Sequence, residues 1–181
     1  EILSQAGPYA KVNPPMRFLD DQKALWQGVT DNILSILTTD HAPFTADEKE
    51  AAWEDLVNSP PGLPSLEMLY PRALHHALNG RWDLDKAVDL VCESPAKLFN
   101  LWPKKGVIRI GSDADFVIFD PNEEYVVDSS KWFTKAKDCD RVYSGLNMNG
   151  NILQTYVRGE LIYGNGEIVG ERGFGEFVRP L

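Results

Sequence analysis

Cysteine, clustered positive charge and long apolar runs are all scarce in this sequence. Only two of its 181 residues are cysteine, Cys92 and Cys139, so a framework of disulfide bonds is not expected. Such sparse cysteine is typical of a reducing compartment, and we expect a cytoplasmic protein. Cys92 lies among apolar residues at helical spacing, which favours a buried thiol over a ligand.

Other absences argue against two kinds of partner. The formal net charge is −9 and no cluster of five or more Lys or Arg occurs, so nucleic acid is not expected. No stretch approaches the roughly 20 apolar residues of a membrane-spanning helix, and no leader pattern opens the chain, so a membrane is not expected either. The first residues, EILS, begin mid-pattern without Met, and we expect a fragment of a longer protein.

The most informative stretch is residues 33–43, ILSILTTDHAP. Its first half is short and apolar and predicts a buried strand, which Pro43 helps to end because proline donates no backbone hydrogen bond. Asp40 follows the apolar run, and α/β barrels place their chemistry at the C-terminal ends of parallel strands. Asp40 is therefore the first candidate for a functional residue, and a carboxylate that caps a turn is an equal alternative on this pattern alone.

Helices are predicted on both sides of that stretch. The expected ranges are 20–28, 46–57, 65–79, 84–93 and 94–101, with a kink at Pro71 and a stop at Gly80. Residues 7–17 are rich in proline and form a rigid connection. Such a connection can hold a polar side chain toward a ligand, although a structural loop is the favoured interpretation.

From Gly106 onward the pattern changes to strands and turns. Strands are predicted at residues 107–110, 115–120, 125–127, 152–157, 161–163 and 168–169, separated by turns rich in Gly and Asn. This pattern indicates a small β module, with a boundary near residues 103–106.

Three separated segments resemble the cyclic amidohydrolases, which include dihydroorotase, hydantoinase, dihydropyrimidinase and allantoinase. Residues 11–17 (KVNPPMR) look most like dihydroorotases, and residues 39–43 (TDHAP) are similar to the end of the eighth barrel strand. Residues 106–117 (GVIRIGSDADFV) resemble the return from barrel to β-sandwich. Residues 61–67 and 94–99 follow the family order, so the resemblance covers nearly the whole chain.

The resemblance implies an α/β fold: the C-terminal part of a metal-dependent (β/α)8 barrel in residues 1–104, then a β-sandwich portion with a C-terminal tail in residues 105–181. Family members carry one or two divalent ions, usually Zn2+. The family's His-x-His pair, bridging lysine and two further histidines are not matched by the three histidines here. The remaining ligands are expected outside this sequence, so the 181-residue segment alone is expected to be inactive.

The resemblance also assigns roles to single residues. Asp40 is expected to be both a metal ligand and the catalytic proton shuttle. Metal lowers the pKa of bound water from roughly 15.7 to about 7, and the carboxylate passes that proton to the departing amide nitrogen. Asn13 is expected to contact the substrate, and the backbone groups of Pro61 and Gly62 to close on its ring. Arg17 either contacts the substrate or only supports its loop.

Phe44 departs from the dihydroorotase pattern. Dihydroorotases typically have a histidine there that binds the substrate carboxylate, a charge-assisted hydrogen bond worth about 1.5–3 kcal/mol. Hydantoinase relatives often have Phe, which we include among the substrate-binding residues.

Dihydroorotase of pyrimidine biosynthesis, which interconverts dihydroorotate and N-carbamoyl-aspartate, is the leading prediction. The alternatives are a hydantoinase, dihydropyrimidinase or allantoinase, or a non-catalytic scaffold with the same fold. The expected partners are a cyclic amide, the rest of the barrel and further copies in a homo-oligomer.

Overall fold

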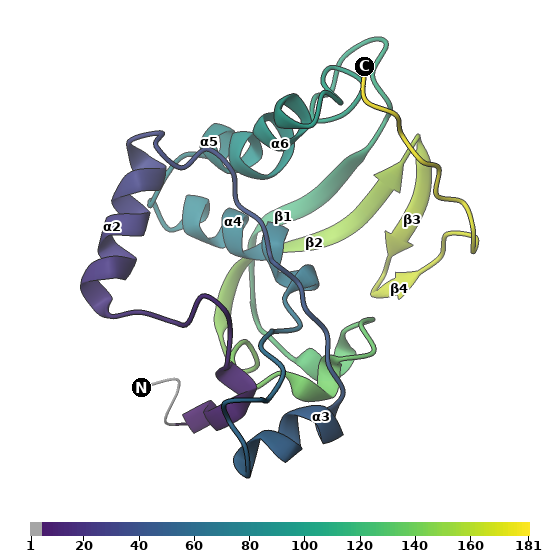
Figure 1. The fold of residues 1–181 in the computed structure, drawn as a ribbon. Helices are drawn as coiled ribbons and strands as arrows, with labels where there is room; N and C mark the ends of the chain where they lie inside the picture. The colour runs from purple at the N-terminus through teal and green to yellow at the C-terminus, as the bar shows by residue number, and fades with distance from the viewer. Residues whose placement is uncertain (1–4) are drawn as a thin grey trace. The chain divides into compact units, whose positions relative to one another are not determined.

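The computed structural model describes residues 5–181, which form two compact units that interleave along the chain (Figure 1). Of the described residues, the first unit comprises 5–34, 38–69 and 125–148, and the second unit comprises 35–37, 70–124 and 149–181. The predicted boundary between residues 104 and 105 concerns the parts of a complete barrel protein and stays a prediction. No helix within the described range is long and apolar enough to cross a membrane.

The first unit contains short helices joined by long irregular segments. They are η1 (Gly7–Ala10), α2 (Leu19–Thr30), α3 (Ala46–Glu50), η2 (Ala51–Trp53), η3 (Leu66–Met68), η5 (Ser129–Lys131) and η6 (Lys137–Cys139). Helix α3 begins at a capping box, in which Thr45 and Glu48 satisfy each other's backbone N–H groups. The helix predicted over residues 46–57 is shorter than expected, because Asp55 accepts from the backbone of Asn58 in a turn (3.1 Å).

The core of the first unit is built from sulfur-containing and aromatic side chains. Met68, Val127 and Met148 are buried, and four half-buried residues pack against them: Tyr125, Trp132, Tyr143 and Leu146. The flexible thioethers fill the irregular spaces between the rings. Trp132 therefore belongs to the core, whereas its neighbour Phe133 is 49% exposed.

The second unit combines helices with the larger part of a four-stranded sheet. Its helices are α4 (Leu69–Leu78, whose first residue is in the first unit), α5 (Leu84–Val88), the π-helical η4 (Asp89–Glu93) and α6 (Ser94–Leu98). Pro71 lies in the first turn of α4, where its missing N–H has no intrahelical partner to lose. Gly80, with a φ of +74°, ends the helical segment as predicted, and its N–H donates to Ala77 O (3.0 Å).

The sheet has the order β1-β2-β3-β4 (Figure 1). The strands are β1 (Phe116–Val126), β2 (Asn147–Val157), β3 (Glu160–Gly164) and β4 (Glu167–Ile168). Strands β2 and β3 pair antiparallel across the turn at Arg158 and Gly159, and β4 pairs antiparallel with β3. The prediction of a strand-and-turn module after Gly106 is thus confirmed from residue 116 onward.

Two predicted strands are wrong. Residues 33–37 pair with no strand of the described chain. Ile33 and Leu34 lie in a bend, where the N–H group of each donates to Gly28 O (2.9 Å), and Ile33 is 76% exposed. Leu37 N instead donates to Leu90 O in η4 (3.0 Å). Residues 107–110 form turns in place of a strand, because Asp113 N donates to Lys104 O (2.9 Å). An apolar run forms a strand only where a second strand accepts its hydrogen bonds, and the local pattern does not contain that information.

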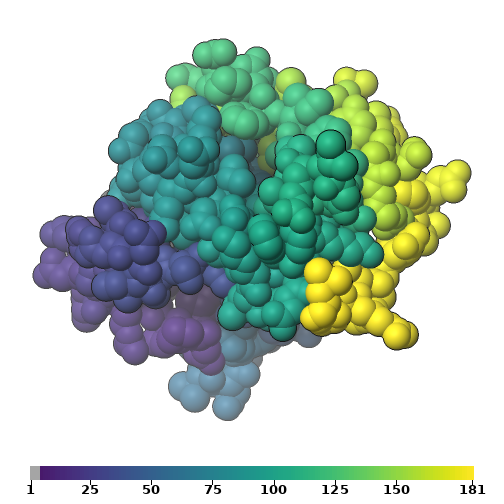
Figure 2. Space-filling model, turned by 90° about the horizontal axis from the view of Figure 1, so that it is seen from above, coloured from purple at the N-terminus to yellow at the C-terminus, as the bar shows by residue number. Residues whose placement is uncertain are grey.

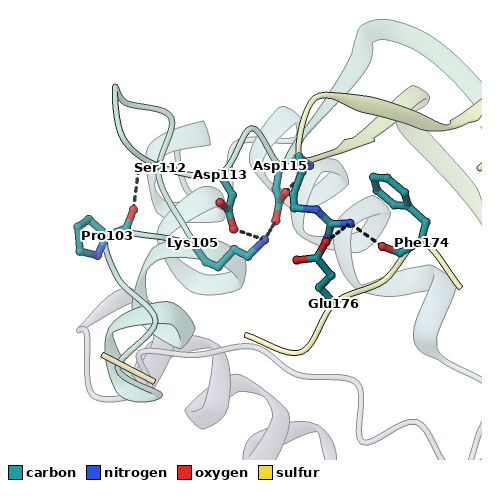
Figure 3. A network of polar contacts seen from close by, with 8 residues as sticks. Pro103, Lys105, Ser112, Asp113, Asp115, Phe174 and Glu176 are labelled. Atoms are coloured by element: carbon teal, nitrogen blue, oxygen red, sulfur yellow. Dashed lines mark hydrogen bonds and ion pairs between the residues drawn. The ribbon is translucent and has the colours of Figure 1, made fainter. Parts of the chain in front are cut away.

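A charged network joins this turn segment to the chain end within the second unit (Figure 3). Lys105 Nζ binds the carboxylates of Asp113 (2.9 Å) and Asp115, and Asp115 Oδ1 also accepts from Arg158 N (2.8 Å). The Arg158 guanidinium in turn donates to Phe174 O (2.5 Å). At the end of the tail, Leu181 N donates to Asn100 O (2.8 Å), and Figure 2 shows these yellow C-terminal residues against the teal segment.

Candidate active site

Asp40 has a backbone conformation that residues with a side chain rarely adopt. Its φ is +45°, in the left-handed region, and its side chain is exposed. Asp tolerates this region better than most residues, but the conformation still costs free energy unless neighbouring contacts impose it. Residues 39–42 make such contacts with residues 63–66.

The imidazole of His41 makes the first of these contacts. Its Nδ1 accepts the backbone N–H groups of Ser65 and Leu66, both at 3.1 Å. These two amides begin the short helix η3, where backbone donors have no intrahelical partner. The ring of His41 therefore satisfies the start of that helix from a distant part of the sequence.

Two further hydrogen bonds complete the connection. The hydroxyl of Ser65 donates to Thr39 O at 3.0 Å, and Ala42 N donates to Leu63 O at 3.2 Å. Ser65 is 4% exposed. The residues on both sides of Asp40 are thus bonded to one rigid segment, which accounts for the left-handed turn between them.

Gly62 brings the predicted Pro61-Gly62 pair against this turn. A Cβ at position 62 would lie 2.5 Å from Ala42 Cβ, 2.7 Å from Ala42 O and 2.8 Å from Phe44 Cε2. Its φ of +156° also disfavours other residues, and its N–H donates to Lys11 O (2.9 Å). Only glycine therefore allows residues 61–62 to pack so closely on residues 42–44.

Two lysine side chains hold the proline loop, defined here as residues 56–64. Lys11 Nζ donates to three of its carbonyl oxygens, those of Leu56, Val57 and Ser59, at 2.7, 2.9 and 2.6 Å. Lys49, only 1% exposed, donates to Pro60 O at 2.9 Å. Burial lowers the pKa of the Lys49 ammonium, because desolvation disfavours its charged form. Both lysines act here as structural donors.

Phe44 packs in the same region of the first unit. Its ring is half-buried, packs near Gly62 and has Lys49 Nζ 5.4 Å from its centroid. Its carbonyl oxygen accepts from Cys139 Sγ at 3.0 Å, and burial raises the pKa of that thiol. The backbone and ring of Phe44 are therefore both held in place, and its contact with a substrate stays a prediction.

The structure brings some of the predicted site residues together and leaves others apart. Gly62, which follows Pro61, packs against Ala42 and Phe44, two and four residues after Asp40. Asn13 and Arg17 are exposed on the segment between η1 and α2, and no contact among the described residues joins their side chains to Asp40. The Asn13–Pro14 peptide bond is cis.

Sequence reasoning missed the residues that support the site. It gave no supporting role to His41, Ser65, Lys11 or Lys49. Their partners lie 11 to 48 residues away in sequence, and most are backbone groups that no side-chain motif can identify. The Thr45–Glu48 capping box, by contrast, could have been read from its spacing.

The described residues do not form a complete metal centre. No group of three or more His, Cys, Asp and Glu side chains is close enough to hold an ion between residues 5 and 181. The exposed carboxylate of Asp40 can serve as one oxygen ligand. His75 and His76 lie on α4 in the second unit, with contacts to Asn149 and Arg72.

Comparison with known proteins decides the family. The profile of the amidohydrolase family matches residues 12–162, most of the chain. The chain belongs to the amidohydrolase family. An L-hydantoinase from Paenarthrobacter aurescens is 36% identical over 173 residues, covering 95% of this chain and 37% of that protein. A D-phenylhydantoinase from Escherichia coli O1:K1 / APEC is 33% identical over 173 residues, covering 93% and 36%.

Solved structures of amidohydrolases agree with these matches. The L-hydantoinase (dihydropyrimidinase) from Arthrobacter aurescens superposes with a TM-score of 0.88 at 34% identity, covering 98% of this chain and 39% of that one. The D-hydantoinase (dihydropyrimidinase) from Thermus sp. gives 0.89 at 29% identity, covering 98% and 40%. The chain thus spans less than half the length of these relatives. The matches support the hydantoinase alternative and not the dihydroorotase prediction.

Proposed function

We propose that this chain is part of a metal-dependent hydrolase that opens cyclic ureides of the hydantoin and dihydropyrimidine type. In this proposal residues 1–104 contribute to a (β/α)8 barrel and residues 105–181 to a β-sandwich, and the rest of the barrel comes from a longer protein that forms homo-oligomers. The family match and the names of the relatives support the reaction class.

The observation that carries the proposal is the environment of Asp40. Its carboxylate is exposed on a left-handed turn, and both neighbouring residues are bonded to residues 63–66. Strained backbone that the surroundings impose is typical of functional sites. A carboxylate that merely ended a helix or turn would not need this arrangement.

The chain's own residues then have definite tasks. A divalent ion, Zn2+ in this proposal, supplies an activated water when bound, and Asp40 is the residue of this chain that would hold it. The Asp40 carboxylate accepts the proton of the attacking water and delivers it to the ring nitrogen as the C–N bond breaks. Without that proton the amide nitrogen is a poor leaving group. The backbone of Pro61 and Gly62 borders the substrate ring, and Asn13 and Arg17 contribute polar contacts from their loop.

Phe44 favours a ring that carries no carboxylate. A phenyl side chain offers no hydrogen bond to the acid group of dihydroorotate, and the loss of such a bond costs about 1.5–3 kcal/mol. Hydantoins and dihydropyrimidines do not require it. We therefore propose the hydantoinase alternative over dihydroorotase as the function.

The test is an assay of the full-length protein, loaded with Zn2+, on 5-phenylhydantoin, dihydrouracil and dihydroorotate. Ring opening of the first or second at a kcat/KM at least tenfold above that for dihydroorotate is expected. Asp40→Asn should lower kcat by about 10²–10⁴-fold, the usual contribution of a positioned acid–base group. Asp20→Asn, the same change at an exposed acid on α2, should leave kcat within twofold. Absence of turnover with metal bound, or an active Asp40→Asn variant, would overturn the proposal.

A further inference from the structure

His41 and Ser65 surround Asp40 with hydrogen bonds that no part of the proposed chemistry requires. Ser65 uses its backbone N–H to reach the ring of His41 (3.1 Å) and its hydroxyl to reach Thr39 O (3.0 Å). It therefore bonds to the residue on each side of Asp40. Leu66 N adds a second donor to the same ring nitrogen (3.1 Å). We call this set of bonds the Ser65 clamp.

The clamp defines the chemical state of the imidazole. A backbone N–H can only donate, so the Nδ1 atom that receives two of them must present a lone pair. A neutral ring then carries its proton on Nε2. The useful property of His41 is thus an acceptor atom at a fixed distance from its own backbone, which an amide side chain of similar length can reproduce and an alkyl side chain cannot.

The clamp also connects the carboxylate to the loop that borders the substrate. The segment that bonds to His41 and Thr39 continues directly into Pro61 and Gly62, and Ala42 N bonds to Leu63 O (3.2 Å). A shift of the His41 ring would therefore move the left-handed turn and the loop relative to each other. Misplacement of a reacting group by about 1 Å can cost about 10²-fold in rate.

We propose that His41 and Ser65 are positioning residues that hold Asp40 in its left-handed conformation and in register with Pro61-Gly62. This inference rests on the proposed function and deepens it. His41 acts through Nδ1 as a hydrogen-bond acceptor and touches neither substrate nor metal. The clamp makes the strained turn the stable conformation, so that the carboxylate is aimed before a substrate arrives.

The decisive comparison is between two substitutions at position 41 in the full-length, Zn2+-loaded protein. His41→Leu removes the acceptor and should lower kcat on the best cyclic ureide by about 10²-fold, with KM changed by less than about fivefold. In His41→Asn, Oδ1 replaces Nδ1, and kcat should stay within about fivefold of the parent. Ser65→Ala keeps the acceptor on His41 and loses the hydroxyl's bonds to Thr39 O and Leu63 O, so its kcat should fall between those of the two variants.

His75 provides a matched control in the second unit. Its Nδ1 likewise accepts a backbone N–H, that of Asn149, at 3.1 Å. His75→Leu therefore loses a bond of the same kind, and kcat should stay within twofold. A general effect of losing a half-buried imidazole acceptor would lower kcat in both leucine variants.

Hydrogen–deuterium exchange separates failure of this inference from failure of the proposed function. His41→Leu should speed exchange in peptides covering residues 39–43 and 62–68, and His75→Leu only near residues 147–151. This result in a protein that opens no cyclic ureide would retain the clamp and reject the substrate class. Three results would each overturn the inference. They are unchanged exchange in His41→Leu, a kcat of His41→Leu within threefold of the parent, and equal losses of kcat in His41→Asn and His41→Leu.

Discussion

At the scale of single residues, the candidate site depends on a glycine, whose missing Cβ leaves room for close packing, and on an aspartate with an unusual backbone conformation. Gly62 has no Cβ, so the proline loop reaches within contact of Ala42 and Phe44. Asp40, two residues before Ala42, has a left-handed conformation that its own side chain disfavours. Close backbone packing at Gly62 and backbone strain at Asp40 thus occur within the same small region, as is typical of functional sites.

Replacing Gly62 tests this close approach. In Gly62→Ala the new Cβ meets Ala42 Cβ at 2.5 Å and Ala42 O at 2.7 Å, and backbone atoms cannot swing aside as a flexible side chain can. We expect a loss of about 1–3 kcal/mol in stability and at least tenfold in kcat/KM. Thermal unfolding and steady-state kinetics of the full-length protein measure both.

Gly80→Ala is the control for that experiment. Gly80 also has a positive φ, +74°, but no atom lies within 4 Å of the position of its Cβ. The Gly80→Ala variant should lose stability through backbone strain, and its kcat/KM should stay at the parent value. Equal kinetic losses in the two variants would contradict a specific role for Gly62.

At the scale of elements, the proline loop is organised by side chains and not by regular hydrogen bonding. Its carbonyl oxygens have few backbone donors available because Pro60, Pro61 and Pro64 lack N–H groups. Lys11 and Lys49 supply charged donors in their place. A segment that resembles a flexible connection in sequence is thereby held in one conformation.

Lys11→Met should loosen this loop while it preserves much of the aliphatic packing. Three charge-assisted hydrogen bonds to carbonyl oxygens are lost, and we expect a decrease of about 1.5–3 kcal/mol in stability. KM should rise severalfold because the substrate must then order residues 61–62. Limited proteolysis within residues 56–60 should become faster.

Lys23→Met is the matched change at a lysine whose ion pair with Asp20 is exposed. Exposed pairs of this kind contribute about 0–1 kcal/mol, so stability and KM should both stay near the parent values. A Lys11→Met variant with the same protease sensitivity as Lys23→Met would show that the loop keeps its shape without the Lys11 donors.

At the scale of the whole molecule, stability should depend on pH through a histidine of the second unit. His76 is half-buried, with its ring edge-on to Trp82 (5.6 Å). Burial is the main cause that lowers the pKa of His76 to about 4, and the nearby charges of Arg72, His75 and Arg81 contribute to the same shift. The unfolded chain, with an ordinary histidine pKa near 6.5, therefore binds more protons than the folded chain between these values.

The sign of the effect follows from that difference in bound protons. The contribution of neutral His76 to the free energy of unfolding is fully present above about pH 6.5 and is lost as the pH falls toward 4. The expected loss is about 1–2 kcal/mol after allowance for solvent screening. Thermal midpoints of the full-length protein between pH 7.5 and 4.5 measure it. His76→Gln should lose less of its midpoint over this range than the parent, and equal losses would contradict the assignment.

The family and the order of its motifs were accessible from sequence because they reside in short contiguous segments. Residues 39–43 and 106–117 carry the resemblance, and the helices from residue 65 to 98 follow from apolar spacing, caps and prolines. The strand-rich module after Gly106 was likewise predictable, since Gly and Asn turns punctuate it. Phe44 alone pointed away from dihydroorotase, and the relatives agree with that departure.

Only the tertiary structure decided how Asp40 is held and which apolar runs form strands. Residues 33–37 and 107–110 have the composition of strands, but a strand requires hydrogen-bond partners supplied by other parts of the fold. The bonds of His41 to Ser65 and Leu66 span 24 and 25 residues and end on backbone amides, which every sequence possesses. Side-chain patterns along the sequence indicate local conformation and family membership. The position of a single carboxylate depends on long-range backbone contacts, which exist only once the chain has folded.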